Sequence, residues 1–461
     1  MEGFVNRERE RVLVELQMKN KKTRYLIIGA GLSGLSTAYH LEERGIKDYM
    51  LLEKNYDIGG LCSSIGGNKD YIIDYTGHLL HFQNSYVEKL VKKLMPGNLN
   101  KIKRNSFIRA FDRDIPYPFQ SNLSYLPGNI RNECLIEYLK IHTSELERTN
   151  INQGEFLGYD NFEDWINRNF GKGIAKYFMI PYNTKLWTVP PREMSTKWMN
   201  NYVPKPEIMH VVRGALLEES KEEGYNAYFY YPKTGGIGSL AEAFSNKLPL
   251  IRSLTEVSKI MPNEKKVVIE NLLGEREEIS YEVLINTMPL KELISDRIEE
   301  TPKEIKDYGN KLKHNSVYSL VIAKKKGIFN KHWVYYPESV YNTYRMGYFN
   351  NFSDSMCPKN EELIYTEYAH RGKESQAGMR KKSFEDLVQI NNSDNFREIF
   401  QFDIPCAYVI YDKNREKSVE GIMQYLNSKN IYSIGRYGAW EYSAMEDAIL
   451  GGKEICERIV K

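Results

Sequence analysis

The chain has 461 residues, of which 41% are hydrophobic and 27% charged, so it can build two or three domains and is not globally disordered. Its 64 Lys and Arg and 61 Asp and Glu leave a formal net charge of +3, which argues against a protein that binds nucleic acid by neutralising phosphates. Five scattered cysteines form no Cys-x-x-Cys pair, so we expect neither a disulfide framework nor a structural metal site. Without an apolar leader or a run of 18 apolar residues, we expect a cytoplasmic protein that has no membrane span.

Residues 24–35, RYLIIGAGLSGL, predict the start of a dinucleotide-binding domain, preceded by a charged N-terminal extension over 1–22. A buried strand runs into Gly29, Gly31 and Gly34, and a helix follows them. In this motif the first glycine permits a tight turn, the second admits a pyrophosphate and the third permits close packing of helix and strand. Glu53 ends the next predicted strand, 19 residues after Gly34, where a carboxylate binds ribose hydroxyls.

A second glycine pair, Gly59-Gly60, follows Glu53 almost directly and is continued by Leu61. This pair resembles the second glycine element of flavin-dependent amine oxidases, where it extends the FAD-binding loop. The resemblance therefore implies FAD as the cofactor, in preference to NAD.

The end of the chain carries a third element of this kind. A short strand over 430–433 precedes Gly435 and Arg436, and an amphipathic helix is predicted from Met445, with Glu446 in its acidic first turn. The element resembles the one that closes over the isoalloxazine and phosphates in the same flavin group.

These segments predict an α/β fold with a discontinuous Rossmann-like FAD-binding domain, formed by residues 23–95, 230–292 and 425–461. Apolar positions near the 3.6-residue period predict a mainly helical substrate domain over 96–229. Short β-branched and aromatic stretches predict an antiparallel-sheet domain over 293–424.

Six stretches in order along the chain resemble UDP-galactopyranose mutases: DYTGHLLH, IPYPFQSN, NFEDW, PYNTKLW, WVYYPE and GRYGAWEY. The resemblance implies that N5 of reduced FAD attacks the anomeric carbon of a nucleotide sugar and expels the diphosphate. The sugar ring then opens and recloses as the furanose. It also implies NAD(P)H as the electron donor, and a role in the biosynthesis of cell-surface polysaccharides.

The resemblance assigns site residues by position. His78, after Gly77, matches a histidine near flavin N5, although a purely structural histidine is the alternative, and His81 fits the core better. Arg345 and Tyr335 match a pair that grips the diphosphate, and Arg436 matches an arginine close to the flavin. The implied catalytic residues are His78, Arg345, Arg436 and Tyr442. The implied substrate-binding residues are Tyr117, Gln120, Asn161, Trp165, Tyr182, Trp187, Tyr335, Arg345 and Tyr442.

Two positions depart from the family pattern. Ile180 stands where an arginine forms the second clamp on the diphosphate, and Ala444 stands where a polar residue is expected. Three nearby cations could substitute for the missing arginine: Arg192, Lys197 and Arg213. The identity of the sugar and nucleotide therefore stays open.

Two other functions compete with the mutase. One is an FAD-dependent oxidoreductase, such as an amine oxidase, a desaturase or a protoporphyrinogen-oxidase-like enzyme, for which an apolar substrate tunnel would be expected. The other is a flavin-binding protein without catalysis. The spacing of Tyr335 to Arg345 and of Arg436 to Tyr442 favours the mutase, and the sequence indicates no oligomeric state.

Overall fold

The computed structural model describes residues 21–460, apart from 67–69, 150–157, 200–202, 204, 206, 218–226, 250, 328–329 and 373. One sheet has the strand order β2-β1-β11-β10-β9, and β17 also pairs with β11. Its strands are β1 (Lys22–Ile28), β2 (Tyr49–Leu52), β9 (Thr255–Met261), β10 (Lys266–Asn271), β11 (Arg276–Asn286) and β17 (Ile431–Ser433). The parallel pairs β1/β2, β1/β11 and β11/β17 join the start, middle and end of the chain, so the discontinuous Rossmann-like fold is confirmed.

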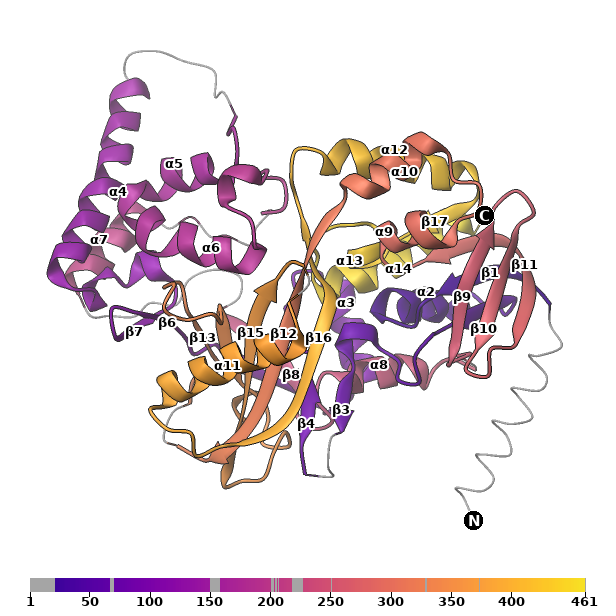
Figure 1. Ribbon diagram of the computed structural model, residues 1–461, viewed down its shortest axis with the longest axis horizontal. Helices are drawn as coiled ribbons and strands as arrows, with labels where there is room; N and C mark the ends of the chain where they lie inside the picture. Colours follow the sequence, from indigo (N-terminus) through magenta and orange to yellow (C-terminus); the bar gives the residue numbers. More distant parts are fainter. Residues whose placement is uncertain are drawn as a thin grey trace.

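Two helices from opposite ends of the chain pack together beside this sheet (Figure 1). They are α2 (Leu32–Glu43) and α14 (Met445–Ile459), both predicted from the sequence. The contact is close because Gly452 has no side chain: a Cβ there would lie 2.6 Å from Ser36 Cβ. The Ser36 hydroxyl in turn donates to the Ile449 carbonyl at 2.7 Å.

The second sheet has the order β16-β12-β15-β14-β13-β6-β7 and is antiparallel except for the parallel pair β13/β6. Its strands are β6 (Ser106–Ala110), β7 (Arg113–Pro116), β12 (Lys313–Lys325), β13 (Trp333–Tyr335), β14 (Arg345–Tyr348), β15 (Glu361–His370) and β16 (Arg397–Ile410). Strands β6 and β7 form a hairpin inside the segment predicted to be mainly helical, and β6 also pairs with β13, more than 200 residues away along the chain. Two separate antiparallel pairs complete the strands: β3 (Ser64–Gly66) with β4 (Ile72–Asp74), and β5 (Leu99–Lys103) with the distant β8 (Tyr228–Pro232).

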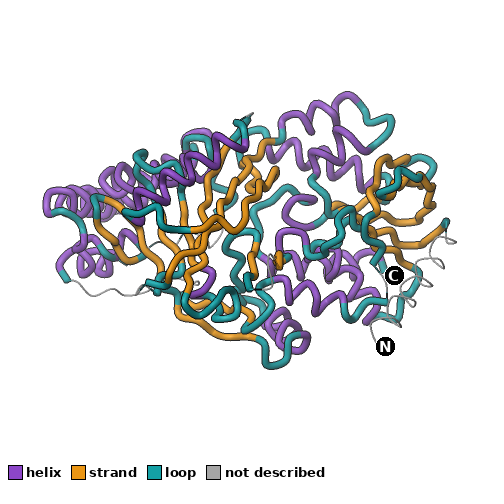
Figure 2. Tube along the Cα trace, turned by 60° about the horizontal axis from the view of Figure 1, so that its bottom comes forward, coloured by secondary structure: helices purple, strands orange, loops and turns teal. Residues whose placement is uncertain are grey.

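The remaining helices fall into two groups. A helical part, at the upper left of Figure 1, contains α4 (Gly128–Thr149), α5 (Phe162–Ile174), α6 (Ile180–Trp187) and α7 (Ile208–Leu216). The others are α3 (Ser85–Leu94), α8 (Gly238–Ser245), α9 (Leu290–Glu292), α10 (Lys303–Lys311), α11 (Gln376–Asn391), α12 (Arg415–Ser428) and α13 (Gly435–Gly438). Figure 2 shows the strands of the seven-stranded sheet lying between the helical part and the nucleotide-binding part.

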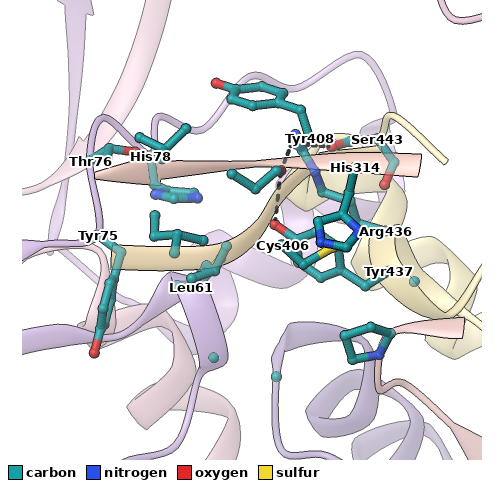
Figure 3. Close-up of a pocket in the computed structure, with 18 of the residues that line it drawn as sticks. Leu61, Tyr75, Thr76, His78, His314, Cys406, Tyr408, Arg436, Tyr437 and Ser443 are labelled. Atoms are coloured by element: carbon teal, nitrogen blue, oxygen red, sulfur yellow. Dashed lines mark hydrogen bonds between the residues drawn. The ribbon is translucent and has the colours of Figure 1, made fainter. Parts of the chain in front are cut away.

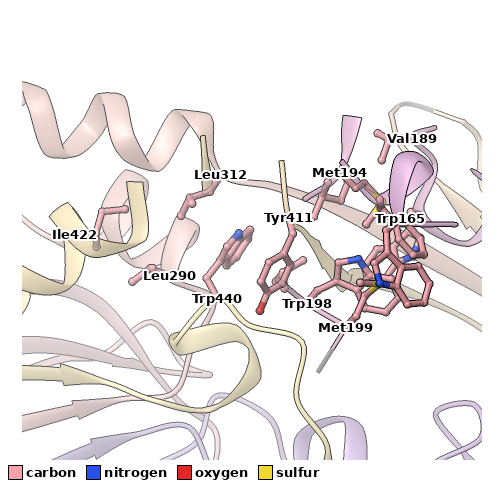
Figure 4. Close-up of a cluster of buried hydrophobic side chains, with 14 of the residues drawn as sticks. Trp165, Val189, Met194, Trp198, Met199, Leu290, Leu312, Tyr411, Ile422 and Trp440 are labelled. Carbon is pink, nitrogen blue, oxygen red and sulfur yellow. The ribbon is translucent and has the colours of Figure 1, made fainter. Parts of the chain in front are cut away.

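An apolar core connects the helical part to the rest of the molecule. Trp198 packs edge-on against Phe162 and Trp187, with ring centroids 5.0 and 4.8 Å away. Figure 4 shows Trp198 and Tyr411 between the cluster around Trp165 and the residues around Trp440. Buried aromatic pairs of this kind add to the stabilisation that comes from apolar burial.

Among the residues that the structure describes, none of the helices has both the length and the apolar character needed to cross a bilayer. Within the same part of the chain, no group of three or more His, Cys, Asp or Glu side chains could hold a metal ion. All five cysteines are free: Cys62, Cys134, Cys357, Cys406 and Cys456.

A buried histidine joins the two parallel strands β6 and β13 and makes stability depend on pH. His332 Nδ1 accepts a hydrogen bond from the Asn105 amide at 2.8 Å, so the ring must be neutral, and burial lowers the pKa of His332 to about 4. Because unfolding returns this pKa to its ordinary value near 6.5, the contribution is complete above pH 6.5 and is lost as the pH falls towards 4.

We expect His332→Gln, whose amide oxygen can still accept the hydrogen bond, to flatten this dependence. Between pH 7 and pH 5 the wild-type protein should lose about 2 kcal/mol of unfolding free energy through His332, on linkage arithmetic. Urea unfolding at the two pH values measures the loss. An equal loss in the variant would show that His332 does not titrate in this way.

Candidate active site

A cavity of about 1540 Å³ lies at the carboxyl ends of β1 and β2 and reaches the second sheet and the helical part. In an open α/β sheet, this end of the strands is where ligands bind. One end of the cavity is lined by glycine loops, and the other by aromatic and arginine side chains. The predicted site residues among those lining it are Gly29, Gly31, Glu53, Gly59, Gly60, Leu61, Gly77, His78, Tyr117, Tyr182, Trp187, Tyr335, Arg345, Gly435, Arg436, Tyr442 and Met445.

The first glycine loop forms an open cradle at the N-terminus of α2. Gly31 has ordinary extended dihedrals, and a Cβ built there would meet nothing within 4 Å. A Cβ on Gly34 would instead lie 1.9 Å from the Gly29 carbonyl oxygen, so Gly34 permits the strand–helix packing. No side chain caps this helix and no acidic residue lies in its first turn, so its amides can bind an anion.

The second glycine pair completes the cradle. The Gly59 amide donates to the Ala30 carbonyl at 2.8 Å, and Gly31 and Gly59 form an isolated parallel bridge. Gly59 has a φ of 102°, which strongly favours glycine. The two loops thus lie side by side, as the sequence predicted for one continuous binding loop.

Glu53 links β2 to the cradle. Its carboxylate accepts from the Ala30 amide at 2.8 Å and from the Asn55 amide at 2.9 Å. Each carboxylate oxygen has a further lone pair, so Glu53 can still accept a bond from a ribose hydroxyl.

His78 lies on one side of the cavity with Tyr75 and Thr76, and Arg436 lies on the other side with His314 and Tyr437 (Figure 3). The Nδ1 atom of His78 is buried and has no hydrogen-bond partner among the described residues. Burial, together with Arg436 and Arg345, lowers the pKa of His78 to about 4. The ring is therefore neutral at pH 7 and can exchange a hydrogen bond with a ligand.

Arg436 places a positive charge against aromatic rings. It donates to the carbonyl oxygens of Ser443 at 3.1 Å and Ala407 at 3.2 Å, and its guanidinium lies 4.9 Å from the Tyr442 ring and 5.1 Å from the Tyr408 ring. Its buried Nε has no partner, and no carboxylate in the described part of the chain forms an ion pair with it. A buried cation of this kind calls for an anionic or electron-rich ligand.

Strand register places Tyr335, Arg345 and Glu367 in one row across β13, β14 and β15. Arg345 donates to one oxygen of Glu367 from Nε at 3.0 Å and from Nη2 at 2.7 Å, and the Tyr344 hydroxyl bonds the other oxygen. Glu367 is fully buried, whereas Arg345 lines the cavity. Glu367 therefore orients the arginine and leaves Nη1 for a ligand.

Tyrosines form the rest of this wall. The Tyr335 ring lies 5.4 Å from Tyr117 and 5.2 Å from Tyr182, and burial raises the pKa of Tyr117 to about 12. Tyr442 packs against Trp187 at 5.7 Å. The hydroxyl groups of these tyrosines supply hydrogen-bond donors and acceptors to the cavity.

Three predicted substrate residues do not line the cavity. Gln120 is buried in a 3-10 turn, Asn161 caps α5 by accepting from the Asp164 amide at 2.9 Å, and Trp165 is buried among aromatic rings. Their contact with substrate stays a prediction. Among cofactor residues, Glu446 does not line the cavity either, because it accepts from the Gln83 and Asn84 amides.

The departures from the family pattern have structural consequences. Ile180 packs against the core, and Ala444 lies at the N-terminus of α14, on the cavity wall. Of the three cations considered as substitutes, Lys197 pairs with Glu416 at 2.5 Å, and Arg192 and Arg213 are exposed away from the cavity. Within the described residues, Arg345 and Arg436 are the arginines that line it.

Sequence reasoning missed three residues of the site: Tyr408, His314 and Glu367. Each lies on a long strand, and Tyr408 and His314 face the cavity. Alternation along the strands could have indicated which side chains share a face, but not which face lines a cavity.

Comparison with known proteins agrees with this geometry. Residues 27–94 match a family described as an NAD(P)-binding Rossmann-like domain. A crystal structure of reduced UDP-galactopyranose mutase is similar over 95% of this chain and 94% of that one, with a TM-score of 0.86 and 27% identity.

Two further structures share the fold at lower identity. A putative protoporphyrinogen oxidase from Exiguobacterium sp. 255-15 has a TM-score of 0.71 and 14% identity, covering 95% of this chain and 98% of that one. A putrescine oxidase variant has a TM-score of 0.62 and 12% identity, with 96% and 99% coverage. Together with the dinucleotide-binding cradle, these similarities support an FAD-dependent flavoenzyme of this superfamily.

Proposed function

We propose that the protein is a reduced-FAD-dependent mutase that interconverts the pyranose and furanose forms of a nucleotide sugar. One observation carries the proposal: a single cavity joins the glycine cradle to the row of Tyr335 and Arg345. The similarity to reduced UDP-galactopyranose mutase along almost the whole chain supports it. An oxidase acting on an apolar substrate would not need this polar wall.

The cradle fits FAD. Gly31 leaves open space where a pyrophosphate can approach, and Glu53 keeps lone pairs for ribose hydroxyls. Arg436, with its unpartnered Nε, and His78, with its unpartnered Nδ1, offer hydrogen bonds to the polar edge of a flavin. When bound and reduced, with NAD(P)H as the proposed electron donor, FAD supplies the N5 nucleophile for the anomeric carbon.

The chain's own residues hold the substrate. Arg345, oriented by Glu367, and the hydroxyls of Tyr335 and Tyr442 bind the diphosphate and stabilise its charge as it leaves. Tyr182 and the buried Trp187 face the sugar and limit the access of water. Among the described residues, Arg345 is the proposed phosphate clamp and Ile180 stands at the second clamp position of the family pattern, so the nucleotide sugar can differ from UDP-galactopyranose.

The test is a direct assay of sugar interconversion. The purified holoprotein is reduced anaerobically with NADPH, NADH or dithionite and is given a panel of UDP-, GDP- and dTDP-hexopyranoses. Chromatography then separates pyranose from furanose. We expect one sugar to be converted by the reduced protein and none by the oxidised protein, because N5 is nucleophilic only in the reduced flavin.

The same holoprotein, left oxidised and assayed in air, separates the mutase from an oxidoreductase, because O2 must reoxidise the flavin for peroxide to form. Absence of interconversion with every sugar, together with peroxide production from an amine or a porphyrinogen, would reject the mutase. Flavin absorbance without either activity would indicate a flavin-binding protein that lacks catalysis.

A further inference from the structure

A half-buried lysine outside the cavity binds the loop that joins two residues of the site. Lys185, on α6, donates from Nζ to three backbone carbonyls: Tyr336 at 2.7 Å, Glu338 at 3.2 Å and Thr343 at 2.8 Å. An ammonium has three N–H groups and no acceptor, so these carbonyls satisfy it completely. Lys185 forms no ion pair with a carboxylate in the described part of the chain.

A carboxylate from another helix holds the same loop. Asp386, on α11, accepts from the Asn342 amide at 3.1 Å and from the Thr343 amide at 2.6 Å. Both Asp386 and Thr343 are buried. The ammonium thus binds the carbonyls of the loop 336–344 and the carboxylate binds its amides.

This loop determines where two site residues lie. Tyr335 immediately precedes it and Arg345 immediately follows it, and the two are paired across β13 and β14. On α6, Tyr182 lies one turn before Lys185, and its ring lies 5.2 Å from Tyr335 and 6.3 Å from Tyr344. A shift of α6 against the loop would separate these side chains.

We propose that Lys185 is a positioning residue that fixes the helix α6 to the loop 336–344, and thereby sets Tyr182 against Tyr335 and Arg345. It touches neither substrate nor cofactor. The part of this inference that concerns ligand affinity rests on the proposed nucleotide-sugar function, whereas the part that concerns the loop does not.

The ionisation of Lys185 supplies an independent readout. Burial lowers the pKa of Lys185 to about 7. The negative charges of Asp386, on α11, and Glu338, in the loop, act to raise this pKa but do not outweigh burial. A neutral amine keeps only two N–H groups, so one of the three carbonyls loses its donor. The loop should therefore loosen as the pH rises through 7.

The first test is amide hydrogen exchange of the FAD-bound protein. In Lys185→Met, which keeps an unbranched side chain one atom shorter and removes the ammonium, residues 336–344 should exchange at least about tenfold faster than in the wild type. Lys172→Met, at an exposed lysine of the neighbouring helix α5, is the matched control and should not change them. In the wild type, protection of Asn342 and Thr343 relative to β1 should fall from pH 6 to pH 8.5.

The second test is titration with UDP as the probe. Lys185→Met should bind UDP at least about tenfold more weakly at unchanged FAD content, and Lys185→Arg should retain part of the affinity because it still donates to carbonyls. Wild-type exchange rates and wild-type UDP affinity in Lys185→Met would overturn the inference. If Lys185→Met does not fold, the wild-type protein decides the question. Hydrogen-exchange protection of Asn342 and Thr343 that does not change with pH would then overturn the inference. Failure of the wild type to bind UDP would count against the nucleotide-sugar function, and the exchange data alone would then decide the role of Lys185.

Discussion

Gly31→Val should give a folded protein that no longer retains FAD. The dihedrals of Gly31, φ −70° and ψ 175°, suit a β-branched residue, and a Cβ there meets nothing within 4 Å. The added methyl groups would project into the cradle, where the backbone must come close to a pyrophosphate. We expect the flavin absorbance per protein to fall by at least about tenfold, which requires a loss of at least about 1.4 kcal/mol of binding free energy. Circular dichroism should remain that of the wild-type protein.

Two other glycine variants make this result specific. Gly451→Ala, on α14 and also free of contacts within 4 Å, lies outside the cavity and should keep full FAD content. Gly34→Ala should fail to fold, because its Cβ would lie 1.9 Å from the Gly29 carbonyl oxygen. If Gly31→Val purifies with stoichiometric FAD, the pyrophosphate does not bind beside Gly31, and the prediction is wrong.

Arg345→Ala should abolish sugar interconversion while FAD stays bound. The side chain is the proposed diphosphate anchor, and loss of one such charge-stabilising group typically lowers kcat by about 10²- to 10³-fold. The single substitution also leaves Glu367 buried without its cation, which costs about 3–5 kcal/mol of stability. Turnover and unfolding must therefore be measured on the same preparations.

The double variant Arg345→Ala/Glu367→Gln separates the two effects. Removing the charge of Glu367 together with that of Arg345 should restore most of the lost stability, measured by urea unfolding, without restoring turnover. Glu367→Gln alone keeps an acceptor for Arg345 and should remain active. Wild-type turnover in the double variant would exclude Arg345 as the phosphate anchor.

The dinucleotide cradle could be predicted from the sequence because its geometry is local. A buried strand, three spaced glycines and a helix suffice to specify the β1-α2-β2 unit and to place Glu53 at its end. The predicted C-terminal helix from Met445 follows from the same kind of signal, an apolar period with an acidic first turn. The conformation of a turn and the end of a helix depend on a few neighbouring residues, so both can be predicted from a single sequence.

Contacts between distant segments could not be predicted in this way. Residues 106–116 were assigned to a mainly helical segment, yet they form the hairpin β6-β7, and β6 pairs with the distant strand β13, an interaction that outweighs local preference. Asn161 and Trp165 lie in a helical pattern that fits equally well with a substrate site or with a cap and an aromatic core. Helical periodicity shows which residues share a face, but not what that face contacts.

The sequence by itself determined that a dinucleotide-binding loop is present and which tyrosines and arginines could serve a phosphate. Only the tertiary structure decided how those charges are compensated. Strand register pairs Arg345 with the buried Glu367, whereas Arg436, within the part of the chain that the structure describes, contacts carbonyl oxygens and aromatic rings and no carboxylate. The physical reason is that the conformation of a glycine loop or turn depends on a few neighbouring residues, so a short stretch of sequence specifies it. The environment of a buried charge is instead fixed by strands and helices that meet from distant parts of the chain.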